Sequence, residues 1–161
     1  NVVFSPDGQT VATASGDKTA KLWNLKGLEI ATLKHQNSVT NVVFSPDGQT
    51  VATASGDNIA HLWNLKGGEI ATLKHQNRVA IVVFSPDGKT VAILSMYDTP
   101  KLWNYEGGEI ATLKHQNKFT DVVFSPDGKT VATVSLDGTA KLWNYEGREI
   151  ATFKHQNWFT D

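Results

Sequence analysis

The stretch VVFSPDG begins at Val2 and returns at Val42, Val82 and Val122, a spacing of 40 residues each time. Each copy is followed by a Thr-Val-Ala run, then by Leu-Trp-Asn, Glu-Ile-Ala-Thr and His-Gln-Asn. The chain therefore consists of four copies of one unit. A repeat of about 40 to 45 residues that contains several short apolar runs is typical of a β-propeller blade. One such unit buries little surface alone, so stability is expected from stacking between neighbouring units.

The second unit indicates how one blade is built. The spacing of Val39, Val42 and Phe44, three residues and then two, predicts a strand with a β-bulge near its start. The Ser-Pro-Asp-Gly sequence at 45–48 then ends the strand in a turn, in which Pro fixes φ and Gly accepts φ > 0. The later strands of the unit are predicted over residues 50–55, 59–64 and 69–74.

Each unit is thus predicted to be a four-stranded antiparallel meander that is apolar on both faces except at its last strand, an exposed edge. Such sheets must be covered by neighbours on both faces, as in a ring or a stack. The predicted fold class is an all-β propeller, with four blades in a single domain of residues 1–161. The units are expected at about 1–37, 38–77, 78–117 and 118–157, and 158–161 start a further inner strand.

The composition disfavours several classes of partner. The 161 residues include 15 basic and 16 acidic side chains, and the formal net charge is −1. This balance produces no field that would attract a polyphosphate or an anionic membrane, so we expect neither nucleic acid nor membrane as a partner. The chain has no cysteine, and therefore no disulfide or thiolate chemistry. A cytoplasmic protein is the default expectation.

The repeated residues resemble the WD-repeat β-propeller family over the whole chain. The matching pattern is a His, then Val-x-x-Val-x-Phe-Ser-Pro-Asp-Gly, then Ser-x-Asp-x-Thr or a close variant, then Lys-Leu-Trp-Asn. Two features depart from the family: Lys-His stands for its usual Gly-His, and Trp-Asn for its Trp-Asp. Neither departure removes the strand pattern.

The resemblance implies a buried polar network in each blade. It joins the His before the first strand, a Ser or Thr of the second strand, the Asp of the next turn and the Trp of the third strand. Such buried polar groups persist only when they satisfy one another. In the second blade the set is His35, Asp57 and Trp63 with either Thr53 or Ser55. The corresponding residues of the other blades are Asp17 and Trp23, and His115, Asp137 and Trp143.

The third blade breaks this pattern. Ile93 stands where the second blade has Thr53, and Tyr97 stands where it has Asp57. We therefore expect His75 to lose both of its polar partners. Because an orphaned buried donor costs about 1 to 3 kcal/mol, raised mobility or a bound water is predicted at this place.

The geometry of blades argues against a ring of four. With sheets about 10 Å apart and strands about 4.8 Å apart, the inner strands of four blades would meet on the axis, whereas eight blades leave a channel of about 6 Å radius. The side chains between blades are small, which prevents wider wedges. We therefore expect a head-to-tail homodimer, related by a two-fold axis, in which the end of each chain meets the beginning of the other and eight blades close the ring.

The sequence predicts no catalytic residue, no metal site and no cofactor. Every blade contains Ser, His and Asp, but a catalytic triad is not needed in several copies, so we interpret them as structural. Four of the five histidines are separated by the blade spacing, and His61 replaces a lysine of the other units. Metal binding by these residues is therefore not expected.

Two positions differ freely between the copies: the residue before the first strand and the residue before the Asp of the later turn. The resemblance implies that they face the top of the disc, where partners of the family bind. Trp, Arg and an exposed Met-Tyr pair are residue types that anchor protein interfaces. The candidate top-face residues are Ser38, Arg78, Lys118, Trp158, Met96, Tyr97 and Leu136. Drift on an unconstrained surface would give the same variation, and Trp158 has the alternative of packing into the subunit junction.

Three functions are open at this point. The first is a non-enzymatic scaffold that presents its top face to a protein or peptide. The second is a self-assembling structural unit, natural or engineered, with no selected ligand, which the near identity of the copies supports almost as well. The third is an enzyme or a carbohydrate binder that uses the central channel.

Overall fold

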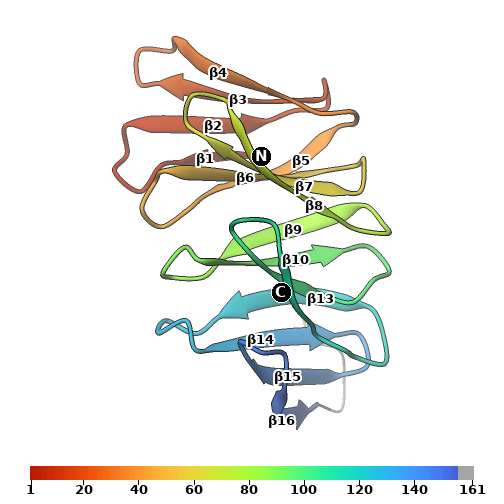
Figure 1. Cartoon of the computed structure of the whole chain (residues 1–161). Helices are drawn as coiled ribbons and strands as arrows, with labels where there is room; N and C mark the ends of the chain where they lie inside the picture. The colour runs from red at the N-terminus through yellow and green to blue at the C-terminus, as the bar shows by residue number, and fades with distance from the viewer. Residues whose placement is uncertain (156–161) are drawn as a thin grey trace.

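The computed structural model describes residues 1–155, in which sixteen strands form four antiparallel sheets (Figure 1). Each sheet contains four strands that are consecutive in the chain and paired in chain order, so each sheet is one blade. The predicted all-β architecture of four-stranded antiparallel blades is confirmed. The predicted inner strand at 158–161, and Trp158 with it, lie outside the described residues.

The four blades have closely similar strand boundaries. The first blade comprises β1 (Val2–Phe4), β2 (Thr10–Ala14), β3 (Thr19–Asn24) and β4 (Glu29–Lys34). The second comprises β5 (Val39–Phe44), β6 (Thr50–Ser55), β7 (Ile59–Asn64) and β8 (Glu69–Lys74). The third comprises β9 (Val79–Phe84), β10 (Thr90–Ser95), β11 (Lys101–Asn104) and β12 (Glu109–Thr112). The fourth comprises β13 (Phe119–Phe124), β14 (Thr130–Ser135), β15 (Thr139–Asn144) and β16 (Glu149–Lys154).

Two bulges shape the second blade. The pairing of β5 with β6 shifts between Val39 and Asn41, which confirms the bulge predicted from the apolar spacing. A second shift lies between Leu62 and Trp63, where β7 pairs with β8. It leaves Ile70 without a cross-strand partner on β7, and the side chain of Ile70 is exposed. The sequence pattern did not predict this second bulge.

The core is divided between the interfaces of consecutive blades. We call the side of a blade that packs against the next blade its trailing face, and the side that packs against the previous blade its leading face. The first interface joins a trailing face of Ala12, Ala20, Leu22, Ala31 and Leu33 to a leading face of Val39, Val42, Val51 and Trp63. Residues at equivalent positions, 40 and 80 along the chain, form the next two interfaces. Stability therefore comes from three similar contacts between neighbours.

Glycines in the turns bring neighbouring blades close together. Gly48 has a φ of +70°, and a Cβ added to it would lie 3.4 Å from Cδ of Pro6 in the previous blade. Gly67 has a φ of +83°, and a Cβ there would lie 3.3 Å from Cβ of Ala31. Glycine suits both needs, because it adopts positive φ and has no side chain at the contact.

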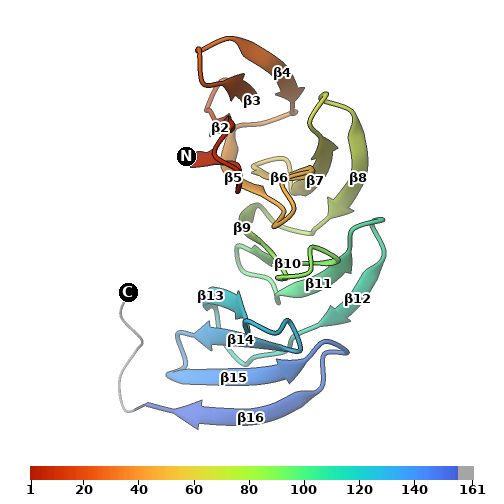
Figure 2. The same cartoon turned by 90° about the vertical axis from the view of Figure 1, so that its left-hand side faces the viewer.

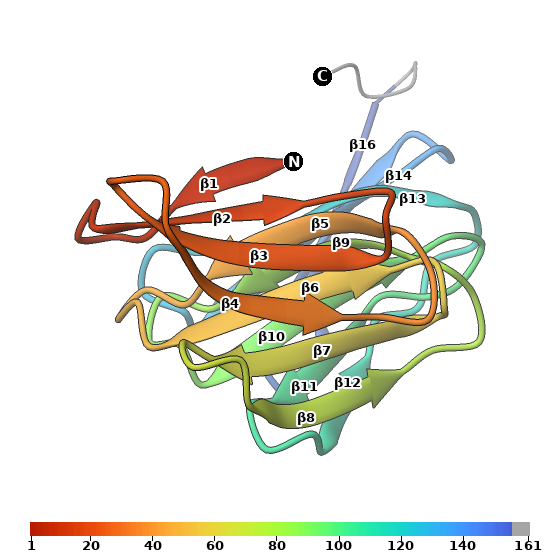
Figure 3. The same cartoon turned by 90° about the horizontal axis from the view of Figure 1, so that it is seen from above.

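The blades form an open arc (Figure 2). The inner strands β1, β5, β9 and β13 lie on one side of the arc and the outer strands on the other, with the first and last blades at its opposite ends. Seen from above, successive blades overlie one another (Figure 3). In residues 1–155, the substantial strand contacts between blades join blades that are consecutive in the chain. The described part of the chain also contains no helix long and apolar enough to span a bilayer.

Candidate functional site

Thr53 is the centre of the polar network in the second blade. The indole Nε1 of Trp63 donates to Thr53 Oγ1 at 2.9 Å, and His35 Nε2 lies 2.8 Å from the same oxygen. His35 Nδ1 lies 3.0 Å from the carbonyl oxygen of Leu33, which only accepts, so Nδ1 carries the proton and Nε2 accepts from the Thr53 hydroxyl. Burial lowers the pKa of His35 and keeps the ring neutral.

Ser55, the alternative partner, is occupied elsewhere. Its Oγ donates to the main-chain oxygen of Asn37 at 3.2 Å. Asp57 does not bond to Trp63. Its Oδ1 accepts from the main-chain N of Ile59 at 3.1 Å and its Oδ2 from Gln36 N at 3.2 Å, so it orders the turn and the incoming loop.

The fourth blade repeats the arrangement around Thr133. Trp143 Nε1 donates to Thr133 Oγ1 at 2.8 Å, and His115 Nε2 lies 2.8 Å from the same atom. His115 Nδ1 lies 3.2 Å from Thr139 Oγ1 and 3.7 Å from Asp137 Oδ2. Burial lowers the pKa of His115, and the Asp137 carboxylate opposes this effect.

The first blade has only part of the network. Trp23 Nε1 donates to Thr13 Oγ1 at 2.9 Å, as in the other two blades. Asp17 is exposed and accepts from the main-chain N of Thr19 at 2.9 Å. No histidine within residues 1–155 forms a hydrogen bond with Thr13, because each network histidine comes from the loop after the previous blade.

The third blade contains a cluster of unsatisfied buried groups. Ile93 is fully buried at the position of the central threonine. As a result, His75 Nε2 and Trp103 Nε1 are buried without a hydrogen-bond partner among the described residues. Asp98 Oδ2, in the turn of the same blade, is also buried without a partner there. Ser95 Oγ approaches His75 Nδ1 at 3.3 Å, a contact that the sequence did not predict. Burial lowers the pKa of His75 to about 4. The bound water or raised mobility stays a prediction.

The same blade is opened at the end that carries the Met96–Pro100 segment. Strand β11 begins only at Lys101, because Pro100 has no N–H to donate. In the other blades, the histidine that follows the fourth strand donates its main-chain N–H to the turn before the third strand of the same blade, as His75 does to Asn58 O at 2.9 Å. His115, which follows the third blade, makes no such bond. The opening forms a cavity of about 400 Å³. Its lining residues are Tyr97, Asp98, Thr99, His115, Gln116, Asn117, Lys118 and Phe119.

Five of the seven candidate top-face residues lie next to one another. Main-chain hydrogen bonds of 2.8 Å join Met96 N to Arg78 O and Leu136 N to Lys118 O. The Lys118 ammonium lies 4.8 Å from the centre of the Tyr97 ring, which links the two pairs across the third and fourth blades. We call this set, Arg78, Met96, Tyr97, Lys118 and Leu136, the top-face arc. Ser38 is joined instead to Gly56, whose N donates to Ser38 O at 2.9 Å.

A family model described as the IFT122 first beta-propeller matches residues 1–160. The chain belongs to this propeller family. The match covers all four blades and confirms the WD-repeat type of propeller that the repeated residues resemble. A search of the curated proteins found no match to the chain.

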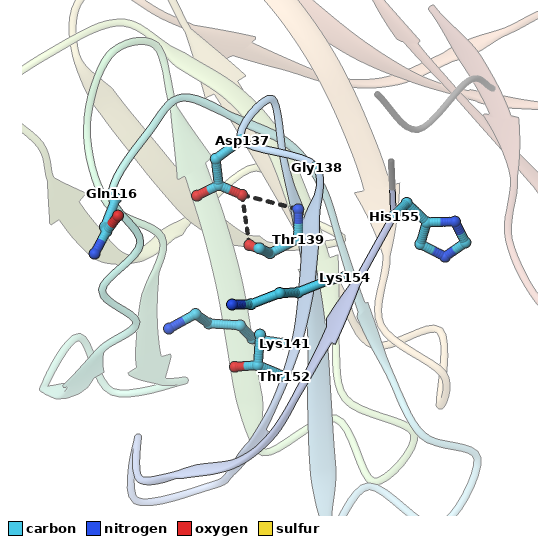
Figure 4. A pocket seen from close by; sticks show the side chains of 8 residues that line it. All are labelled: Gln116, Asp137, Gly138, Thr139, Lys141, Thr152, Lys154 and His155. Carbon is cyan, nitrogen blue, oxygen red and sulfur yellow. Dashed lines mark hydrogen bonds between the residues drawn. The ribbon is translucent and has the colours of Figure 1, made fainter. Parts of the chain in front are cut away.

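Two further cavities lie in the described part of the propeller. A cavity of about 560 Å³ in the fourth blade contains Lys141 and Lys154 (Figure 4), but Lys141 is paired with Glu149 at 2.6 Å. An apolar groove of about 400 Å³ runs along β1, β5 and β9, where Val, Phe and Pro predominate. Among residues 1–155, no group of three or more His, Cys, Asp or Glu side chains is arranged to hold a metal ion.

Ser95 and His75 form a serine–histidine pair in the third blade, the residue types of a nucleophile and its base. Ser95 is 3% exposed, and the pKa of about 4 makes His75 a weak base at neutral pH. The unsatisfied Asp98 Oδ2 does not orient the ring through a hydrogen bond. This pair therefore fits a structural role better than a catalytic one.

Proposed function

We propose that this propeller is a non-enzymatic scaffold for protein–protein interaction, which binds a protein or peptide on its top-face arc and associates with a second copy to close the ring. The observation that carries the binding proposal is the continuity of the arc. Its residues belong to positions that differ between otherwise near-identical blades, yet they meet on one surface.

The chemistry of the arc suits an interface. Tyr97 is 75% exposed although it is large and apolar, and its φ of +64° is uncommon for a bulky residue and costs about 1 to 2 kcal/mol. Lys18 and Asn58 have a similar φ in the corresponding turns of the first and second blades, so the exposure of Tyr97, not its φ, supports an interface. The Lys118 ammonium lies over the Tyr97 ring, and Arg78 is joined to Met96 through the main chain, so an apolar anchor and cationic residues belong to one set, as in interface hot spots.

Selection from a random-peptide library against the immobilised chain tests the binding proposal. We expect selected peptides whose dissociation constants rise about tenfold or more with Tyr97→Ala, a loss of about 1.4 kcal/mol. Tyr145→Ala is the matched control, because Tyr145 is also exposed but lies in a turn outside the arc. Peptides that bind the wild type and Tyr97→Ala equally, or a failure to select any, would remove the arc as a binding site.

The self-association proposal rests on the two end faces of the arc. On the leading face of the first blade Val2 is 63% exposed, whereas the equivalent Val42 is 0% exposed. On the trailing face of the fourth blade Phe153 is 49% exposed, whereas the equivalent Leu73 is 0% exposed. The two faces have the same residue pattern as those that pack together inside the chain, so a second copy fits both.

The mass in solution tests self-association. One chain has a mass of 17.6 kDa, and light scattering is expected to report twice this value. A folded chain of single mass at all accessible concentrations would contradict the proposal.

The alternative function is a self-assembling propeller, natural or engineered, without a selected ligand. The near identity of the four units favours it. A double mass together with no selectable peptide would support this alternative over the scaffold. The cytoplasmic location stays a prediction.

A further inference from the structure

In the second and fourth blades, the histidine of the polar network comes from the loop after the previous blade. His35 follows the first blade and reaches Thr53 of the second, and His115 follows the third blade and reaches Thr133 of the fourth. The first blade has no previous blade in the described chain. Its Thr13 accepts a hydrogen bond from Trp23, but no residue within 1–155 accepts the hydrogen of the Thr13 hydroxyl.

His155 is placed to supply this contact to another copy. It follows the fourth blade 40 residues after His115, at the position from which a network histidine enters the next blade. It is exposed, and in Figure 4 its side chain points away from Lys141 and Lys154.

The glycine contacts fix how a second copy would sit. A Cβ on Gly48, Gly88 or Gly128 would touch a proline of the previous blade, whereas a Cβ on Gly8 would meet nothing within 4 Å. Likewise Gly67 and Gly107 approach an alanine of the previous blade, and Gly27 is open. Continuing the same interface from the fourth blade brings Pro126 to Gly8 and Ala151 to Gly27 of the other copy.

We propose that His155 of one copy completes the polar network of the first blade of a second copy, so that each copy supplies the other with a buried residue. In the completed network His155 Nε2 accepts from the Thr13 hydroxyl, which itself accepts from Trp23 Nε1, as in the second blade. The network thereby fixes the register in which the two arcs join. The inference rests on the proposed self-association.

The dissociation constant of the full-chain dimer, measured by sedimentation over a range of concentrations, tests the inference. We expect His155→Ala to raise this constant about tenfold or more, and the adjacent, exposed Lys154→Ala to leave it within about twofold. An equal mixture of His155→Ala and Thr13→Val chains should form the heterodimer in preference to either homodimer, because only the heterodimer regains one intact His155–Thr13 junction.

The outcomes separate the inference from the proposed function. A dimer that is as tight with His155→Ala as with Lys154→Ala, or variants that mix in statistical proportion, would overturn the role of His155 and leave self-association standing. A wild-type chain that never dimerises would overturn both. Thermal melting of each variant below its dissociation constant checks that the single chain still folds.

Discussion

Replacing Ile93 with threonine should repair the network of the third blade. Ile93 pairs with Val82 and Lys101 in the register in which Thr53 pairs with Val42 and His61, so a threonine there would present its hydroxyl to the same neighbours. The hydroxyl would satisfy His75 Nε2 and Trp103 Nε1, both now buried without partners.

The magnitude follows from a comparison with valine, which has nearly the same shape as threonine but no hydroxyl. Ile93→Val removes one buried methylene and should cost about 1 kcal/mol. Relief of two unsatisfied buried groups, at about 1 to 3 kcal/mol each, should make Ile93→Thr more stable than Ile93→Val by about 2 kcal/mol or more, after the cost of burying the hydroxyl. Relative to the wild type, we expect a gain of about 1 kcal/mol.

Urea denaturation at one fixed protein concentration measures the three free energies of unfolding, since self-association makes stability depend on concentration. The indole N–H signal of Trp103 in an NMR spectrum should also shift in Ile93→Thr but not in Ile93→Val. The reasoning is refuted if Ile93→Thr is no more stable than Ile93→Val, because the hydroxyl would then have found no partner.

Two further predictions concern the intact networks. Thr53→Val should lower the free energy of unfolding, measured by urea denaturation, by about 3 kcal/mol, because it leaves both His35 Nε2 and Trp63 Nε1 without a partner. The control Thr72→Val, at an exposed position of the same blade, should change it by no more than about 0.5 kcal/mol. Equal effects of the two substitutions would show that the network is not the cause. Burial lowers the pKa values of His35, His75 and His115 in the folded chain, so the unfolded chain binds more protons between the ordinary value near 6.5 and about 4. The free energy of unfolding should therefore be highest above pH 6.5 and decrease as the pH falls toward 4. The decrease should be smaller in His75→Phe. A urea midpoint that does not change between these pH values would contradict the claim that the histidines are buried in their neutral form.

The repeat made most of the fold predictable. Because four copies can be compared within one chain, the strands of the second blade, its first bulge and the loss at Ile93 could all be predicted from the sequence. The second bulge could not, since Ile70 continues an apolar alternation and nothing in the sequence indicates that it faces solvent.

The details of the site depended on distances between segments. Thr53 and Ser55 lie two residues apart on β6 and therefore on one face of the strand, so only the reach of Trp63 decides between them. The stacking of Lys118 on Tyr97 joins a turn of one blade to the loop before the next, and no local pattern predicts how those two segments meet. No local pattern predicts the unsatisfied Asp98 Oδ2 either, because it depends on the shape of the turn at Tyr97.

A count of the blades in the assembled particle tests the central claim most directly. Electron-microscopy averages of the purified chain, viewed along the ring axis, are predicted to show a closed disc of eight blades around an open channel, with two chains in each disc. A closed ring of four blades, or particles that remain open arcs at concentrations well above the dissociation constant, would contradict the account.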